Sequence, residues 1–321
     1  ATDLLSERAI ARRNKAGISV PDQKDIPVYA PYLDTVKSKG LALHCTSRWM
    51  NTALFKSVIP VDPAELMDLP GVEDIRIVKK PTGKSSSFSK TDLMPEYLMT
   101  DQYARPISML NGLNLHNSGF EGSGILIAVL DAGFPNANII SSLNNLRNRK
   151  GVKGTYDFVL GKKNVYSYHE HGTIILSVLA GEIEGILQGT APGADFLLLR
   201  TEDSYSEFLS EEDFWAAGAE FADSAGADII TSSLGYYSFD DPLMNYKYSD
   251  LDGNKAFVTR VADIAASKGI VVITSAGNER NKEWKYITAP ADADSVLTVG
   301  AVDAGNMISA FSSAGPSADG R

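Results

Sequence analysis

The sequence of 321 residues contains a single cysteine, Cys45, so no disulfide can form within the chain. It has no CxxC motif and no cluster of cysteine with histidine, which excludes the common zinc frameworks. No apolar run approaches the ~18 residues that a membrane-spanning helix needs. The net charge is −10, from 30 basic and 40 acidic residues. This balance disfavours nucleic-acid binding, which usually needs a basic face.

The first part of the chain, residues 1–80, predicts a small α+β domain. A helix with a terminal glycine is expected over 30–40, and a short helix over 62–71, with Asp62 as N-cap and Pro63 at its first position. Strands are expected over 41–49, 51–60 and 72–80, the first two forming a hairpin around Trp49–Asn51. This β-β-α-β order predicts a split, ferredoxin-like fold.

Residues 81–103 interrupt this pattern and predict an exposed linker. The stretch "KPTGKSSSFSKTD" at its start is rich in serine, lysine, glycine and proline and has little apolar surface to bury. Such segments are preferred sites of proteolytic cutting.

Residues 104–321 predict a second domain of α/β class with a parallel sheet. Nearly continuous apolar strands, such as "GILIAVLDAG" and "GIVVITSAGN", alternate with helical stretches at 171–180, 211–225 and 255–268. In such sheets functional groups gather at the carboxyl ends of the strands. The residues that follow the apolar runs are Asp131, Thr201–Asp203, Ser233–Gly235 and Gly277–Asn278.

Asp131 and His171 are candidates for acid–base chemistry. Asp131 ends a strand, where it is either a turn or N-cap residue or a buried carboxylate that orients an imidazole. His171 opens a helix, whose dipole opposes the imidazolium and favours the neutral form that a general base needs. The alternative is a partly buried structural histidine. A metal site at His169 and His171 is weakly indicated, because no third ligand is near and an i, i+2 pair diverges on a helix.

Two further strand ends could line a site or simply form turns. Asn278, after "SAG", could direct its amide toward an oxyanion. Gly235, in "SSLGYY", leaves room for an extended peptide to pass. Turn formation explains either residue on its own.

The order of these motifs resembles that of the subtilisin-like serine proteases, or subtilases. The matches are "VLDAGF", "HEHGT", "SLG" and "SAGN", and they extend the resemblance over about 104–321. The resemblance implies that Asp131 orients His171, that His171 acts as general base and then general acid, and that Asn278 holds the oxyanion. It further implies a substrate cleft for proteins or peptides, lined by Ser233, Leu234, Gly235 and Gly277.

The front domain is similar to a subtilase propeptide through "SRWMN" and "LPGVEDIRIV". The resemblance implies a zymogen or propeptide-bound form, in which the propeptide packs on the catalytic domain. It also implies a secreted or cell-envelope protein whose signal peptide has been removed. No cofactor is required, and calcium is common in the family.

The nucleophilic serine of the family, in a Gly-Thr-Ser motif, has no counterpart among the 321 residues. It is expected beyond Arg321, and this chain alone is expected to be inactive. Three explanations are open: a nicked protease with a retained C-terminal fragment, an incomplete chain, or a pseudoprotease that binds or regulates without catalysis. The polar stretch "GPSADGR" favours nicking.

Specificity and metal binding give two weaker hypotheses. Glu202 or Asp203 could face the cleft and favour basic substrate side chains, although an acidic loop before a helix also explains them. A loop at 239–254 with Asp240, Asp241, Asp250 and Asp252 suggests calcium but lacks EF-hand spacing. A dinucleotide enzyme is disfavoured, because "GFEGSG" precedes its strand whereas a nucleotide-binding glycine loop follows one.

Overall fold

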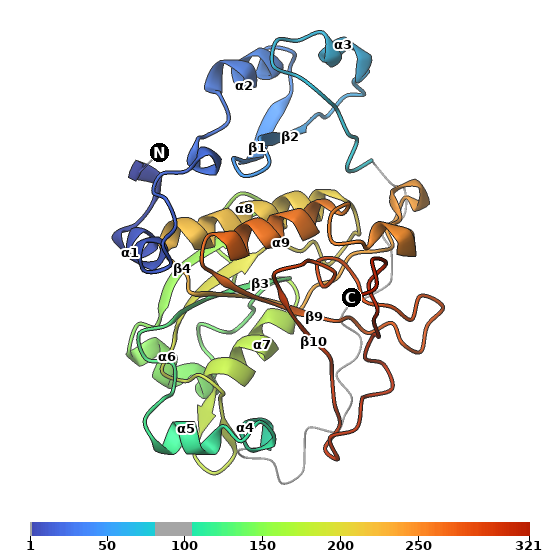
Figure 1. Cartoon of the computed structure of the whole chain (residues 1–321). Helices are drawn as coiled ribbons and strands as arrows, with labels where there is room; N and C mark the ends of the chain where they lie inside the picture. The colour runs from blue at the N-terminus through green and yellow to red at the C-terminus, as the bar shows by residue number, and fades with distance from the viewer. Residues whose placement is uncertain (1, 81–104) are drawn as a thin grey trace.

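The computed structural model describes residues 2–80 and 105–321, so the predicted linker at 81–103 lies outside the described residues. Six parallel strands of the described chain form one sheet in the order β10-β9-β8-β3-β7-β4 (Figure 1). The strands are β3 (Leu126–Asp131), β4 (Val152–Asp157), β7 (Asp195–Arg200), β8 (Ile229–Ser232), β9 (Val271–Ser275) and β10 (Leu297–Val299). The predicted α/β class with a parallel sheet is confirmed.

The central strand β3 is buried along its whole length. Its side chains alternate between two cores: Leu126, Ala128 and Leu130 lie in one, Ile127 and Val129 in the other. A strand covered on both faces needs apolar residues at every position, which explains its continuous apolar sequence.

Helices cover both faces of the sheet (Figure 1). On one face lie α8 (Ser210–Ala225) and α9 (Phe257–Ser267), and on the other lies α7 (His171–Ala180). The helix α8 ends at Gly226, whose φ of 89° is left-handed and suits glycine. Shorter elements complete this part of the chain: α4 (Arg105–Met109), α5 (Leu113–Asn117), α6 (Asn144–Asn148), β5 (Glu182–Ile183) and β6 (Leu187–Gln188).

Residues 2–80 form a smaller unit, the front unit, that lies over α8 and α9 (Figure 1). Its elements are α1 (Glu7–Lys15), α2 (Ala30–Lys37), β1 (Ala42–Ser47), β2 (Thr52–Lys56) and α3 (Ala64–Met67). The hairpin is confirmed, with Asn51 at a positive φ of 52° in its turn.

The predicted third strand of the front unit is wrong. Residues 72–80 form no strand, so the sheet of residues 2–80 has two strands, fewer than a ferredoxin-like fold. This segment instead extends along the second domain. The carbonyl of Val78 accepts a hydrogen bond from the backbone of Ser210, and Lys79 and Lys80 pair with Asp203 and Asp241. Contacts to the neighbouring unit replace strand pairing.

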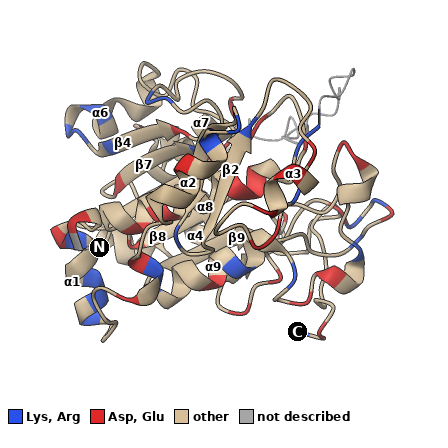
Figure 2. Ribbon diagram, turned by 90° about the horizontal axis from the view of Figure 1, so that it is seen from above, with Lys and Arg blue, Asp and Glu red and all other residues tan. Residues whose placement is uncertain are grey.

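Buried ion pairs hold α1 against the end of α8. Arg13 donates to Asp25 at 2.7 Å and to Asp223 at 2.5 Å, with all three side chains at most 1% exposed. Arg12 also pairs with Asp223. Figure 2 shows the basic residues along α1. Because an unpaired buried charge is very costly, these partners stabilise the front unit only in its docked position.

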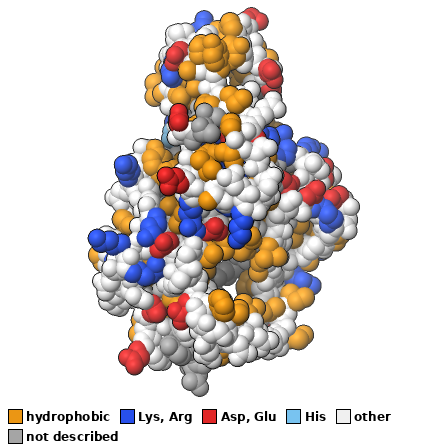
Figure 3. Space-filling model, turned by 60° about the vertical axis from the view of Figure 1, so that its left-hand side comes forward, with side chains coloured by type: hydrophobic (Ala, Val, Ile, Leu, Met, Phe, Trp, Pro, Cys, Tyr) orange, Lys and Arg blue, Asp and Glu red, His pale blue; other side chains and the backbone are white. Residues whose placement is uncertain are grey.

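The exposed apolar side chains of the described surface include two groups that bear on the assembly of the fold. Those of the front unit include Tyr29, Val58 and Ile59, and orange side chains gather on this upper part of the molecule in Figure 3. At the edge of the large sheet, Leu297 and Val299 on β10 are exposed as well. Within the described residues, no helix is both long and apolar enough to cross a membrane.

Candidate active site

The structure brings Asp131 and His171 together at the carboxyl end of β3. The Nδ1 atom of His171 lies 2.9 Å from both carboxylate oxygens of Asp131. The Asp131 side chain is 0% exposed and that of His171 is 18% exposed. The backbone N–H of Ala132 donates to Asp131 Oδ1 at 2.7 Å. A buried carboxylate thus fixes the ring, while the imidazole keeps some access to solvent.

Two glycines allow the helix to approach the strand end closely. A Cβ atom on Gly172 would lie 2.4 Å from the carbonyl oxygen of Gly133 and 3.0 Å from Asp131 Cβ. Gly133 has a φ of 146°, and its own Cβ would lie 2.4 Å from the Ser167 carbonyl. Only glycine fits such contacts, so both residues set the distance between histidine and aspartate.

The pKa of His171 is raised above its ordinary value. Burial by itself lowers this pKa, because it disfavours the charged imidazolium. The hydrogen bond and the negative charge of Asp131 act in the opposite direction and prevail, with a smaller contribution from Glu202. The site therefore stabilises the imidazolium that forms when a histidine accepts a proton.

His169 has a structural contact that the sequence did not reveal. Its Nδ1 atom accepts a hydrogen bond from the backbone N–H of His171 at 3.2 Å. The first N–H groups of a helix have no partner within the helix, so this contact satisfies one of them. The two histidines of the motif therefore have different surroundings.

The predicted cleft residues follow β8 and β9. Leu234 is buried, whereas Gly235 and Asn278 are exposed. Gly277 has a φ of 107°. The segments "SLG" and "AGN" follow the neighbouring parallel strands β8 and β9. They therefore lie at the carboxyl ends of the strands, as Asp131 does.

A buried threonine that the sequence reading missed lies between these two segments. A Cβ atom on Gly235 would lie 2.1 Å from the Thr288 hydroxyl oxygen, and one on Gly277 would lie 3.1 Å from it. This Oγ1 atom is buried and has no hydrogen-bond partner among the described residues. Thr288 follows Asn278 by ten residues, in a stretch where no local pattern marks it.

The two predicted specificity residues, Glu202 and Asp203, have different surroundings in the structure. Glu202 is buried at 2% exposure and accepts a hydrogen bond from the Tyr236 hydroxyl at 3.1 Å. Asp203 is partly exposed and pairs with Lys79 of the front unit at 3.1 Å. Its pKa is lowered: burial raises it, but hydrogen bonds from Ser206 and Lys79 and the charge of Lys79 outweigh burial.

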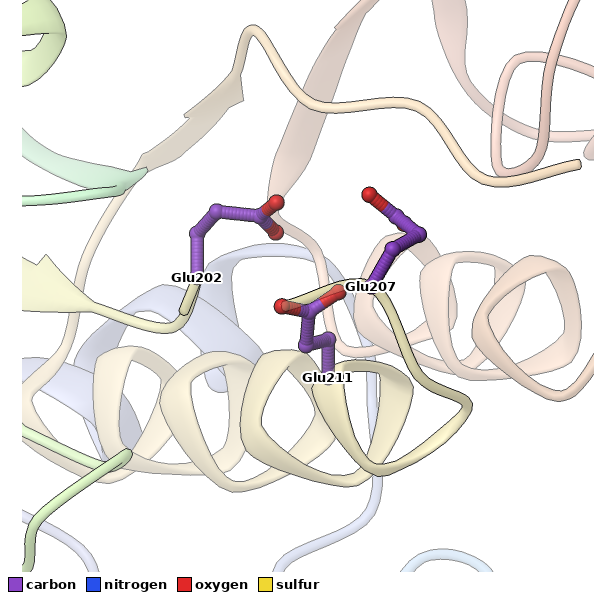
Figure 4. A group of neighbouring side chains, drawn as sticks. All are labelled: Glu202, Glu207 and Glu211. Carbon is purple, nitrogen blue, oxygen red and sulfur yellow. The ribbon is translucent and has the colours of Figure 1, made fainter. Parts of the chain in front are cut away.

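Among residues 2–80 and 105–321, one cluster of three carboxylates is compact enough to hold a cation. Oxygen atoms of Glu202, Glu207 and Glu211 lie within 4.8 Å of one another, and Figure 4 shows Glu202 and Glu211 pointing toward each other. Protein groups already bind part of this set, because Glu211 accepts a hydrogen bond from the backbone of Asp203.

The aspartates of the predicted calcium loop have separate partners. Asp240 accepts from the Glu207 backbone and Asp241 pairs with Lys80. Asp250 pairs with Lys255, and Asp252 accepts from the Asn254 backbone. Calcium binding stays a prediction.

A parallel sheet with a buried carboxylate–imidazole pair at the carboxyl ends of its strands is typical of α/β hydrolytic enzymes. The family model described as "Subtilase family" matches residues 122–321. A second, described as "Peptidase S8 propeptide domain, Bacteroidota", matches residues 1–92. The chain belongs to the subtilase family, and a propeptide domain forms its N-terminal part.

Individual relatives agree with this assignment. Subtilisin E of Bacillus subtilis (strain 168) is 30% identical over 291 residues, which cover 89% of this chain and 65% of the relative. A subtilisin of Bacillus pumilus is 32% identical over 217 residues, covering 66% of this chain and 69% of the relative. This chain thus spans about two thirds of the length of these relatives.

A solved structure supports the fold. The MycP3 protease from the type VII (ESX-3) secretion system superposes with a TM-score of 0.52 at 22% identity. The match covers 68% of this chain and 63% of that protein.

Proposed function

We propose that this chain supplies two members of the catalytic triad of a serine endopeptidase, together with its propeptide. The hydrogen bond between His171 Nδ1 and the buried Asp131 is the observation that carries the proposal. In this mechanism His171 Nε2 removes a proton from a serine hydroxyl, which attacks the peptide carbonyl. Asp131 holds the ring and stabilises the imidazolium. His171 then donates the proton to the leaving amine.

The nucleophilic serine of this proposal lies outside the 321 residues. Two observations support this: the sequence contains no Gly-Thr-Ser motif, and the chain spans 65% of the length of subtilisin E. The exposed apolar residues Leu297 and Val299 on β10 give a surface on which a further segment of the same fold would pack. The partner segment would complete both the core and the triad.

The cleft of the proposed enzyme runs past the ends of β8 and β9. Gly235 would leave room for an extended substrate, and Asn278, which is exposed, would donate to the oxyanion. Asp203 is the better candidate for attracting a basic substrate residue, because Glu202 is buried against Tyr236. Lys79 neutralises Asp203 while the front unit is docked. Propeptide release would therefore expose this carboxylate.

The proposal extends to location and regulation. The front unit acts as a chaperone and inhibitor that is released by cutting between residues 81 and 103. The protein works outside the cytoplasm, in the cell envelope or beyond it, as its resemblance to Bacillus subtilisins suggests. Calcium would stabilise the fold without taking part in the chemistry.

Labelling with a fluorophosphonate, applied to the protein expressed from the complete open reading frame, tests the activity. We expect one serine adduct in the mature wild type and none in His171→Ala, since the nucleophile then lacks its base. The 321-residue chain alone should stay unlabelled. Native and denaturing mass spectrometry would show whether a second polypeptide accompanies it.

The opposite result identifies the rival function. If the mature, complete protein neither reacts with the probe nor cleaves peptides, the proposal fails and a non-catalytic binding protein is left. Asn278→Ala is a useful further variant, because it should lower kcat by about 100-fold with little effect on folding.

A further inference from the structure

Three charged residues end three neighbouring strands in one row. Asp131 on β3 is the register partner of Arg200 on β7, and Arg200 is the register partner of Asp157 on β4. All three are at most 1% exposed. Charges almost never lie so deep without a partner, and the alternating signs give each one a neighbour of opposite charge.

The Arg200 guanidinium is bound to the strand end that carries Asp131. Its Nε–H donates to the carbonyl of Ala132 at 3.1 Å, and its NH1 donates to both oxygens of Asp157 at 3.2 and 3.1 Å. The N–H of the same Ala132 donates to Asp131 Oδ1. One residue therefore links the guanidinium to the carboxylate that orients His171.

Arg200 also contacts the loop that leads into α7, the helix that begins at His171. The Arg200 Cζ atom lies 3.7 Å from the centroid of the Tyr168 ring. Tyr168 has a φ of 74°, a left-handed conformation that is costly for an aromatic residue. A stacked guanidinium offsets part of this cost and fixes the residue directly before His169.

We propose that Arg200 is a positioning residue for the proposed reaction: it fixes the Asp131 strand end and the His171 loop in one geometry. A planar guanidinium is suited to this because it can donate along its edges and stack through its face at the same time. A lysine ammonium keeps the charge but has no planar group, so it cannot reproduce the edge donation and the face-to-face stacking together. Asp157 supplies the compensating charge that lets the guanidinium remain buried.

The inference rests on the Asp131–His171 pair of the proposed function, and Arg200→Lys tests it on the chain as it exists. Because the charge is retained, a change in His171 reports orientation rather than the loss of a nearby cation. We expect the pKa of His171, followed by NMR titration, to fall by about 0.5–1 unit as its bond to Asp131 loosens. The Nδ1–H resonance should also move upfield.

Arg149→Lys is the matched control. Arg149 donates to Asp195 at 2.9 Å and to the carbonyl of Pro192. These contacts lie at the start of β7, the opposite end of the strand from Arg200. A structural loss alone would lower stability in both variants, whereas only Arg200→Lys should shift His171. An unchanged His171 titration in folded Arg200→Lys overturns the inference.

Two further variants keep the test decisive. If Arg200→Lys does not fold, Tyr168→Leu removes the stacking ring from the loop side and should shift His171 in the same direction, whereas Tyr166→Leu should not. Asp131→Asn separates the two proposals. If it leaves the His171 titration unchanged, the proposed catalytic pair itself fails; if it shifts His171 but Arg200→Lys and Tyr168→Leu do not, only the role of Arg200 fails.

Discussion

The imidazole of His169 accepts a hydrogen bond from the backbone N–H of His171, so the first histidine of the motif holds the start of the helix that carries the second. To accept at Nδ1, His169 must be unprotonated at that atom. The first histidine thus satisfies a backbone group of the helix, and the second binds Asp131. A shared metal site is not what this geometry indicates, because one ring is directed to the backbone and the other to Asp131.

Replacing His169 should affect stability more than chemistry. His169→Ala removes the acceptor and should lower the free energy of unfolding by about 1 kcal/mol, as expected for the loss of a helix-capping contact. His169→Asn, which can still accept, should recover part of this. Urea denaturation measures both. A shift of the His171 pKa comparable to that in Asp131→Asn would contradict this assignment.

Asp131→Asn should lower the pKa of His171. Asparagine cannot supply the charge that raises this pKa, while burial continues to lower it. NMR titration of the 321-residue chain measures the change, and His44 serves as an internal control because it bonds the carbonyl of Phe158 instead. The proposed reaction requires neutral His171, so kcat/KM of the complete protein should rise with pH through the raised pKa of His171.

The sequence predicts the contact between Asp131 and His171 well, because its determinants are local. Asp131 follows an apolar strand, and His171 precedes a glycine and an apolar helix, with α7 at the predicted residues 171–180. It does not predict Arg200 as part of the site. The strand β4, "VKGTYD", contains a glycine and alternating polar residues, so neither the strand nor its terminal Asp157 stands out.

Burial of the acidic residues on α8 also escapes prediction from sequence. Glu211, Glu212 and Asp213 read as a solvated first turn, a favourable place for acids in an isolated helix. In the structure the loop with Tyr246 and the front unit cover this turn, so Glu212 is fully buried. Tertiary contacts with distant segments determine whether these acidic side chains are buried, and the local sequence pattern does not indicate such contacts.

Gly172→Ala should destabilise the chain although alanine favours helices. The added methyl group would lie 2.4 Å from the Gly133 carbonyl and 2.8 Å from the Phe134 ring, so backbone must move. We expect a loss of about 2 kcal/mol in unfolding free energy, typical of overpacking. Gly305→Ala is the control, since its Cβ would meet only the end of the Asp303 side chain, at 3.3 Å. Equal stability of the two variants would refute the close approach.

Glu220 on α8 should be a main anchor of the front unit. Its carboxylate accepts from the Ser47 hydroxyl at 2.6 Å and from the backbone N–H groups of Arg48 and Trp49, both at 3.1 Å. Glu220→Ala leaves these donors without an acceptor, which costs about 2 kcal/mol. Hydrogen exchange of the Trp49 amide should accelerate by about 30-fold.

The exposed Glu184 provides the comparison for this variant. Glu184→Ala removes a carboxylate at a distance from the front unit and should leave Trp49 exchange unchanged. If Glu220→Ala also leaves it unchanged, Glu220 is not a main anchor, and other contacts, such as the ion pairs of α1 and of Lys79, hold the front unit.

Glu212 should make the chain less stable as the pH rises from 5 to 8. Burial raises its pKa to about 7 from 4.5, against hydrogen bonds from Tyr246 and Val258 that lower it. Below pH 4.5 the group is protonated in both states; between 4.5 and 7 it ionises first in the unfolded chain. The folded state then loses stability relative to the unfolded state, by up to about 3 kcal/mol. Glu212→Gln cannot ionise, so its unfolding free energy should lack this decrease.

Urea denaturation of wild type and Glu212→Gln at pH 5 and pH 8 gives the difference directly. The difference in unfolding free energy, wild type minus Glu212→Gln, should be larger at pH 5 than at pH 8. At pH 5 Glu212 is neutral in the folded state, whereas at pH 8 it is ionised. Glu65→Gln, which alters an exposed carboxylate on α3, should show the same margin at both values. A margin for Glu212→Gln that is independent of pH would mean that this carboxylate is ionised when buried, with a cation nearby to stabilise it.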